Sequence, residues 1–181
     1  MGHQPTYRHL RWYNHFMKKE LDDLLAKGLG AGYAGKIIPE TVKRGPFEGG
    51  KQSLFTSETN GVYLDQWFAH QNGGGQELVQ DKDGDRATRL YGGGNLAPEE
   101  LAALGTNEEE VINYLIKKVG QLGNKTRLHE NCFPEADGDW QYSYKILQPN
   151  VGGIPLTIGL ESIDFKQTTV FAHGFILSPI K

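Results

Sequence analysis

Two glutamates in glycine-flanked, strand-like segments are the residues whose type and spacing best suit chemistry. Glu77 follows the glycine-rich turn 72–75, and Glu161 follows Gly159 by two residues. A carboxylate buried in an apolar cleft has its pKa raised by desolvation, which suits a general base. The alternatives are a carboxylate that points to water and one that pairs with an arginine such as Arg89 or Arg127.

Aromatic side chains on the same strands form the second candidate set. Tyrosine and tryptophan combine a large apolar area with a polar atom, so they line small-molecule pockets as well as ordinary cores. We predict a ligand-binding surface made of these aromatics, the two glutamates and one histidine: Tyr63, Trp67, Glu77, Tyr91, Trp140, Tyr142, Tyr144, Glu161 and His173. Core filling is the alternative for each aromatic.

An aspartate-rich stretch imitates the opening of a calcium-binding loop. Asp81, Asp83 and Asp85 have the spacing of its first ligands, but the loop also needs glycine at its sixth position and glutamate at its twelfth. Those positions hold Arg86 and Gly92. A hairpin turn is therefore the better interpretation.

The only cysteine, Cys132, lies close in sequence to His129 and Glu130, residue types that could activate a thiol nucleophile. Neighbours in sequence need not meet in space, however. A lone cysteine is more often a small buried apolar side chain, and we favour that interpretation.

Metal and cofactor sites have no sequence signature in this chain. The histidines lack the spacing of metal ligands. The glycine clusters lack the strand-to-helix context of phosphate-binding loops. We therefore expect no metal and no cofactor.

The composition is that of a soluble globular chain, with 181 residues, 38% hydrophobic and 23% charged, and a net charge of -3. The chain lacks the clustered basic face that is typical of nucleic-acid binding. It also lacks an apolar run of transmembrane length. A single cysteine favours a reducing compartment. We predict a cytoplasmic protein with no nucleic-acid partner and no membrane partner.

The elements that must position the candidate residues are helices alternating with groups of strands. Helical periodicity predicts a first helix over 6–27 that ends at Gly28, and two more over 98–104 and 107–122. Two-residue alternation and turn signals predict strands over 52–57, 62–68, 76–80, 86–91, 140–146, 156–163 and 169–177. We expect one α+β domain over 1–181 with helices packed on antiparallel sheet.

The order of these elements suggests an internal duplication. Each half, about 6–94 and 98–178, has a helix, antiparallel strands, and a glutamate that precedes an apolar returning strand. Chance similarity between β-rich segments is the alternative. Two related halves would meet across a shared cleft, and clefts at such junctions often bind ligands.

Four short motifs carry a family resemblance: Tyr63-x-Asp65, Gly74-Gly75-x-Glu77, Tyr91-Gly92-Gly93 and Asp139-Trp140-x-Tyr142. Over roughly 30–176 the chain resembles a bacterial domain family of unknown function. Similar segments occur alone or behind helix-turn-helix domains in regulator-like proteins. We expect no DNA-binding domain in this sequence, which instead carries an extra N-terminal helix. The resemblance implies a sensing or partner-binding domain and supplies no catalytic residues.

The leading hypothesis is a non-catalytic, sensor-like domain that binds a small, partly apolar ligand between its halves. The first alternative is a hydrolase or isomerase that uses Glu77 or Glu161 as a general base. The second is a protein-interaction module with an exposed strand edge, binding another protein or a second copy of the chain.

Overall fold

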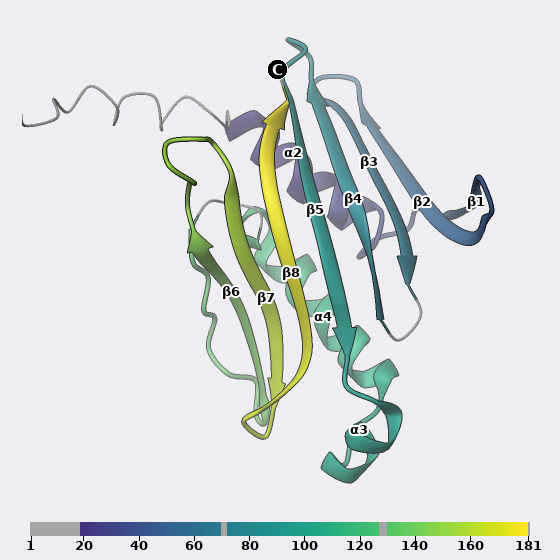
Figure 1. Cartoon of the computed structure of the whole chain (residues 1–181), viewed down its shortest axis with the longest axis vertical. Helices are drawn as coiled ribbons and strands as arrows, with labels where there is room; N and C mark the ends of the chain where they lie inside the picture. The colour runs from purple at the N-terminus through teal and green to yellow at the C-terminus, as the bar shows by residue number, and fades with distance from the viewer. Residues whose placement is uncertain (1–18, 70–71, 127–129, 181) are drawn as a thin grey trace, which may run out of the picture.

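An antiparallel sheet with helices on one face forms the framework of the chain (Figure 1). The computed structural model describes residues 19–69, 72–126 and 130–180. Within them the sheet has eight strands in the order β1-β2-β3-β4-β5-β8-β7-β6. The predicted α+β class with an antiparallel sheet is therefore confirmed.

The elements follow one another in two groups of strands separated by helices. Their bounds are α2 (Lys19–Ala31), β1 (Glu40–Arg44), β2 (Phe47–Ser57), β3 (Gly61–Ala69), β4 (Asn72–Asp81), β5 (Arg86–Asn95), α3 (Pro98–Leu104), α4 (Glu108–Leu122), the 3-10 turn η1 (Gly123–Thr126), β6 (Trp140–Gln148), β7 (Thr157–Phe165) and β8 (Thr168–Ile180).

The two groups of strands join edge to edge. The last strand, β8, pairs antiparallel with β5, so Tyr91 lies opposite Phe175 in one continuous sheet. The sequence suggested two β-rich halves meeting across a cleft. In the structure they share one sheet, and the space between elements lies on the face covered by the helices.

The aspartate-rich stretch forms the β4–β5 hairpin turn, as predicted. The Asp81 carboxylate accepts hydrogen bonds from the backbone N–H groups of Asp83 and Asp85, each at 2.9 Å. Gly84 has a φ of 88°, a conformation that costs glycine little. The side chain of Asp81 therefore closes the turn.

The first helix does not end where the sequence placed its end. Its start, predicted at residue 6, lies outside the described residues, and α2 continues through Gly28 to Ala31. Gly28 is buried, and a Cβ atom added there would overlap the ring of Tyr63. The prediction was wrong because this glycine allows the helix to approach β3 closely.

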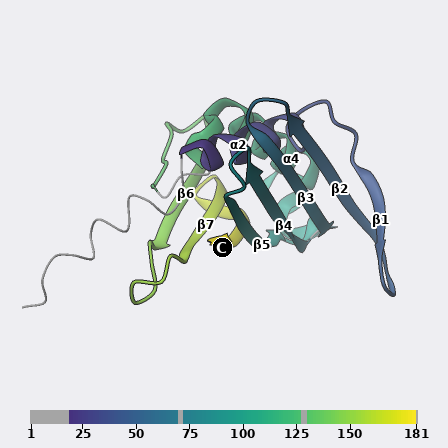
Figure 2. The same cartoon turned by 90° about the horizontal axis from the view of Figure 1, so that it is seen from above.

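The core lies between the sheet and helices α2 and α4, which share one face of the sheet (Figure 2). Helix α2 contributes Leu21, Leu24 and Leu25, and α4 contributes Val111 and Leu115. Their helical spacing puts each set on one stripe of its helix. Asn107 caps α4 by accepting the N–H of Glu110.

The opposite face of the sheet carries exposed apolar side chains. Leu90 on β5 lies opposite Ile176 on β8, which in turn lies opposite Ile158 on β7. Leu90 is 45% exposed and Ile176 is 39% exposed. Among the described residues, no helix is both long and apolar enough to cross a bilayer.

Candidate functional site

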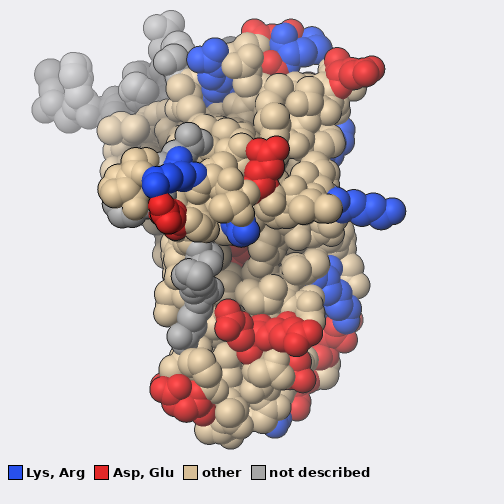
Figure 3. Space-filling view, turned by 90° about the vertical axis from the view of Figure 1, so that its right-hand side faces the viewer, with Lys and Arg blue, Asp and Glu red and all other residues tan. Residues whose placement is uncertain are grey.

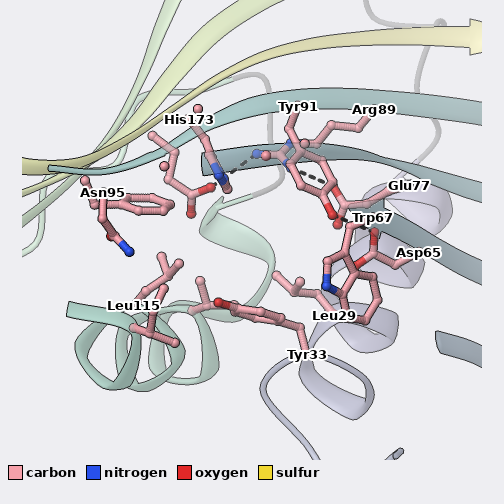
Figure 4. Close-up of a pocket in the computed structure, with 18 residues that line it drawn as sticks. Leu29, Tyr33, Asp65, Trp67, Glu77, Arg89, Tyr91, Asn95, Leu115 and His173 are labelled. Carbon is pink, nitrogen blue, oxygen red and sulfur yellow. Dashed lines mark hydrogen bonds and ion pairs between the residues drawn. The ribbon is translucent and has the colours of Figure 1, made fainter. Parts of the chain in front are cut away.

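A cavity of about 110 Å³ lies between the sheet and the two helices (Figure 4). Its floor comes from β3, β4, β5, β7 and β8, and its roof from α2, α4 and the residues after α2. The lining residues are Leu29, Tyr33, Asp65, Trp67, Gly73, Gly74, Glu77, Arg89, Tyr91, Gly93, Gly94, Asn95, Ile112, Leu115, Val119, Glu161, Phe171 and His173.

Arg89 joins the two candidate glutamates in the wall of this cavity. Its Nη1 donates to Glu77 Oε2 at 2.7 Å, and its Nη2 donates to Glu161 Oε2 at 3.3 Å. All three side chains are almost fully buried. Charge-assisted hydrogen bonds of this kind are strong where water is excluded. One guanidinium therefore holds two carboxylates that are far apart in sequence.

Each glutamate also accepts a tyrosine hydroxyl. Tyr63 donates to Glu77 Oε1 at 2.9 Å, and Tyr142 donates to Glu161 Oε1 at 2.6 Å. Both carboxylates are thus oriented from two sides, by one tyrosine and by Arg89. This arrangement fixes their positions relative to the cavity.

Strand register brings these groups onto one face of the sheet. Asp65, Glu77 and Arg89 lie directly opposite one another across β3, β4 and β5. Strand β8 separates Arg89 from Glu161 on β7, so the arginine side chain must cross it. The guanidinium carbon lies 4.7 Å from the centre of the Phe175 ring on β8. The face of this ring attracts the guanidinium and so helps to hold the charged group in place.

A second polar pair lies beside the first. The Tyr91 hydroxyl donates to Asp65 Oδ1 at 2.9 Å. The ring of Tyr91 also lies 5.3 Å from the His173 ring, between their centres. On the neighbouring strand, a Cβ atom at Gly75 would lie 2.5 Å from the Tyr91 hydroxyl. Glycine at that position therefore leaves room for Tyr91 to reach Asp65.

The acidic surroundings change the pKa values of the neighbouring donors. Burial, with added contributions from Glu161 and Asp65, raises the pKa of Tyr33 to about 12. Burial, Asp65 and Glu77 also raise the pKa of Tyr91. Burial alone would lower the pKa of Arg89, but Glu77 and Glu161 raise it above its usual value. At neutral pH both tyrosines therefore keep their protons and Arg89 keeps its charge.

Asn95 supplies a further polar group at the end of β5. It is buried, and within the described part of the chain its Oδ1 atom has no hydrogen-bond partner. Figure 4 shows its side chain pointing from the sheet toward α4, across the cavity. A buried amide normally has partners, so this group is available to a bound molecule.

The structure brings five of the predicted residues to the cavity wall, namely Trp67, Glu77, Tyr91, Glu161 and His173. Tyr63 and Tyr142 stand behind the glutamates and donate to them. All of these residues except Trp67 are linked through Arg89, whose guanidinium carbon also lies 5.4 Å from the centre of the Tyr91 ring.

The other two predicted residues do not line the cavity. Trp140 packs against Tyr114 and Phe165, with ring centres 5.0 and 4.5 Å apart. Tyr144 stacks on Phe175 at 4.8 Å. The Trp140 ring packs between the sheet and α4, and Tyr144 is part of the buried core, which was the alternative interpretation of the aromatics.

The predicted set of site residues omitted Asp65, Arg89, Asn95 and Tyr33. The sequence had named Arg89 only as a possible partner of the glutamates, and the structure confirms that pairing. Two of the omitted residues carried a signal, because Asp65 alternates in phase with Tyr63 and Trp67, and Arg89 in phase with Tyr91. Asn95 ends its strand and Tyr33 follows a helix, so no periodicity marks either one.

Cys132 lies outside this group of residues. It is half-buried, and its backbone N–H donates to the carbonyl of Tyr144. Burial raises the pKa of its thiol, which reduces the reactive thiolate at neutral pH. The neighbouring His129 lies outside the described residues.

Figure 3 shows the molecule from the β1 side, with a hollow near the middle of this face. Acidic side chains gather below the hollow, where α3 and the start of α4 lie. The first turns of these helices carry Glu99 and Glu100, and Glu108, Glu109 and Glu110. This face of the protein is therefore locally negative.

Comparison with protein-family models, curated proteins and solved structures finds no match.

Proposed function

We propose that this protein binds a small organic molecule in the cavity between the sheet and helices α2 and α4. The observation that carries the proposal is the buried polar cluster, in which Arg89 holds Glu77 and Glu161 in the cavity wall. A buried ion pair contributes little to stability compared with a well-packed apolar core. A few convergent polar groups in a mostly apolar cavity are typical of a ligand site.

The proposal includes two related halves, each contributing to the site. Exchanging β3-β4-β5 with β6-β7-β8 leaves the strand order β3-β4-β5-β8-β7-β6 unchanged. The exchange replaces the Tyr63–Glu77 hydrogen bond with the Tyr142–Glu161 hydrogen bond. The central pair, Tyr91 opposite Phe175, would then lie on the two-fold axis.

Register across the halves supports this relationship. Glu77 lies opposite Arg89, and Glu161 lies opposite His173. Arg89 and His173 therefore occupy equivalent places beside equivalent glutamates. The cavity would lie over the axis, with a different basic residue on each side.

We also propose that the protein has a sensor-like role in the cytoplasm. The family resemblance implies a sensing domain, and one half-buried cysteine, Cys132, fits a reducing compartment. The general-base hypothesis has weaker support, because both glutamates are already held by Arg89 and a tyrosine.

A protein-interaction role is the second candidate, and a specific observation favours it. An apolar row of Leu90, Ile176 and the half-buried Ile158 crosses three strands on the face opposite the helices. Apolar patches of this kind often mark interfaces. Replacing Leu90 with lysine and measuring mass against concentration by sedimentation would test it, since loss of self-association is expected only from an interface.

Two matched variants on α4 test the ligand-binding proposal. Ile112 lines the cavity, whereas Ile116 lies one turn further along the same helix and does not. A fragment library screened by ligand-observed NMR should give binders that Ile112→Phe excludes and Ile116→Phe retains. If no fragment responds to the change at Ile112, the cavity is not a binding site.

A further inference from the structure

We propose that the cavity binds a small neutral molecule that carries a carboxamide group, and that Asn95 recognises this group. The inference rests on the proposed ligand-binding function and specifies the chemical class of the ligand. Three features of the described residues support it: the buried amide of Asn95, the bare backbone beside that amide, and the pairing of the charged groups elsewhere in the wall.

The side chain of Asn95 is the feature that points to a ligand. It is only 8% exposed, and within the described residues its Oδ1 atom has no hydrogen-bond partner. Figure 4 shows this side chain reaching into the cavity from the end of β5. A buried polar atom without a partner destabilises the folded state. A ligand that supplies the partner would recover that free energy.

The chemistry of this side chain favours a particular kind of partner. The asparagine amide offers an acceptor oxygen and a donor nitrogen. Rotation about its Cβ–Cγ bond is only weakly restricted, so either atom can turn toward the cavity. A ligand with both a donor and an acceptor can meet the amide in either orientation, whereas an acceptor alone can meet it in only one. A carboxamide is the simplest group of this kind.

The charged groups of the cavity wall are held by one another. Arg89 donates to Glu77 and Glu161. The Asp65 carboxylate accepts the hydroxyl of Tyr91. A charged ligand would have to leave water and compete with these contacts, which is costly in a buried site. A neutral ligand avoids this cost.

Two glycines leave open space beside Asn95. Gly93 precedes Asn95 by two residues on β5, so it shares the same face of the sheet. Gly93 lies opposite Gly73 on β4, and both glycines line the cavity. A Cβ atom at Gly93 would lie 1.9 Å from the carbonyl oxygen of Ala172, so no side chain fits there. A flat carboxamide can therefore lie against the backbone next to Asn95.

The size of the cavity limits the body of the ligand. An engineered apolar cavity of roughly 150 Å³ accommodates benzene. A cavity of about 110 Å³ therefore suits a short branched aliphatic chain attached to the carboxamide. The lining side chains Leu29, Leu115 and Val119 would contact such a chain.

Three probes of one shape test the hydrogen-bonding requirement: isobutyramide, methyl isopropyl ketone and isobutyrate. Titrations followed by ligand-observed NMR at neutral pH and equal ionic strength should show the amide binding about tenfold more tightly than the ketone, equivalent to about 1.4 kcal/mol. The ketone lacks the donor. Isobutyrate lacks the donor and also carries a charge, so it should bind least. The comparison uses the unaltered protein, so it does not depend on whether a variant folds.

Two matched substitutions test whether Asn95 recognises the amide. Asn95→Leu replaces the carboxamide with an apolar group of similar size, and it should remove the preference for isobutyramide over the ketone. Asn113→Leu makes the same change at an exposed residue of α4 that does not line the cavity, and it should leave the preference intact. Because Asn95→Leu also removes an unpartnered buried atom, it should raise the melting temperature of the ligand-free protein by about 2 °C or more.

The outcomes distinguish this inference from the function on which it rests. Ketone or isobutyrate binding as tightly as isobutyramide, with that binding abolished by Ile112→Phe, would preserve the ligand site and overturn the carboxamide. A preference that survives Asn95→Leu, or a lower melting temperature of that variant, would overturn the role of Asn95. Fragments that Ile112→Phe excludes, with no binding of isobutyramide, would preserve the site alone. A cavity that binds none of the probes or fragments removes both proposals.

Discussion

Replacing Gly28 with alanine tests whether the close approach of helix α2 positions the polar cluster. Gly28 packs on the ring of Tyr63, whose hydroxyl donates to Glu77. A Cβ atom at this position would overlap Cγ and Cδ1 of Tyr63 and lie 2.6 Å from its Cβ. Because Tyr63 is buried and tethered at its far end, neither the ring nor the helix can move freely.

Two opposing effects set the change in the free energy of unfolding for Gly28→Ala. Alanine is favoured over glycine inside a helix by about 1 kcal/mol. Forcing an extra carbon into a well-packed core costs about 1 to 3 kcal/mol. Gly30 provides a matched control, since it lies in the same helix and has nothing within 4 Å of its Cβ position. The propensity gain is common to both variants, so their difference isolates the packing cost.

Chemical denaturation of both variants provides the assay. Gly30→Ala should be slightly more stable than the parent, and Gly28→Ala should be less stable than Gly30→Ala by about 1 to 3 kcal/mol. In thermal melts the two should differ by about 5 °C for a chain of this length. Equal stability of the two variants would refute the close packing of α2 against Tyr63.

The Gly28→Ala substitution should also affect the cavity. Displacing the Tyr63 ring weakens its hydrogen bond to Glu77, while Arg89 still holds the other carboxylate oxygen. Binding of the fragments that Ile112→Phe excludes should therefore weaken in Gly28→Ala and stay unchanged in Gly30→Ala. Unchanged binding in a destabilised Gly28→Ala would mean that Tyr63 supports the fold alone.

Further predictions concern buried charge and pH. Arg89→Met leaves two buried carboxylates without the guanidinium of Arg89, so the free energy of unfolding should fall by about 3 to 5 kcal/mol at neutral pH in chemical denaturation. A loss smaller than that for removing a surface ion pair would contradict the buried pairing. Burial, reinforced by Asp23, raises the pKa of Asp22 to about 7. Since the folded carboxyl binds its proton more tightly than the unfolded one, stability should fall as the pH rises from about 4 to about 7. Asp22→Asn should raise the melting temperature at pH 8 and leave it unchanged at pH 4. An equal effect at both pH values would disprove the raised pKa of Asp22.

Seven of the eight strands in the described residues were readable from the sequence, because alternation and turn chemistry are local. Strand β1 was not predicted, and β2 begins at Phe47 rather than at residue 52. Asn60-Gly61 and the Asp81 turn mark where the chain must reverse, and both fall between paired strands. The pairing of β5 with β8, in contrast, could not be predicted from local patterns. It joins residues about half the chain apart, and no local pattern specifies which strand edges meet.

The prediction that the first helix ends at Gly28 was wrong for a related reason. Glycine is the usual C-terminal stop of a helix when only the local sequence is considered. At Gly28 the deciding contact is with Tyr63 on another element. Tertiary packing therefore overrode a local preference, and the sequence contained no sign of that contact.

The cluster shows the same division between local and distant information. Alternation places Asp65 in phase with Tyr63, and Arg89 in phase with Tyr91, so their shared faces could be predicted. That one arginine reaches both Glu77 and Glu161 depends on the β5–β8 junction. The shared contact of Arg89 with both glutamates could therefore not be predicted from the sequence.

The proposed two-fold relationship gives a physical reason for the single arginine in the cluster. In that relationship Glu77 and Glu161 occupy equivalent positions, but the residues opposite them are Arg89 and His173. Arg89 donates to both glutamates, so a second arginine at residue 173 is not needed to hold Glu161. Histidine at this position instead packs its ring against Phe171 at 4.5 Å and against Tyr91 at 5.3 Å, between ring centres. The difference between the halves would then give the two sides of the cavity different side chains.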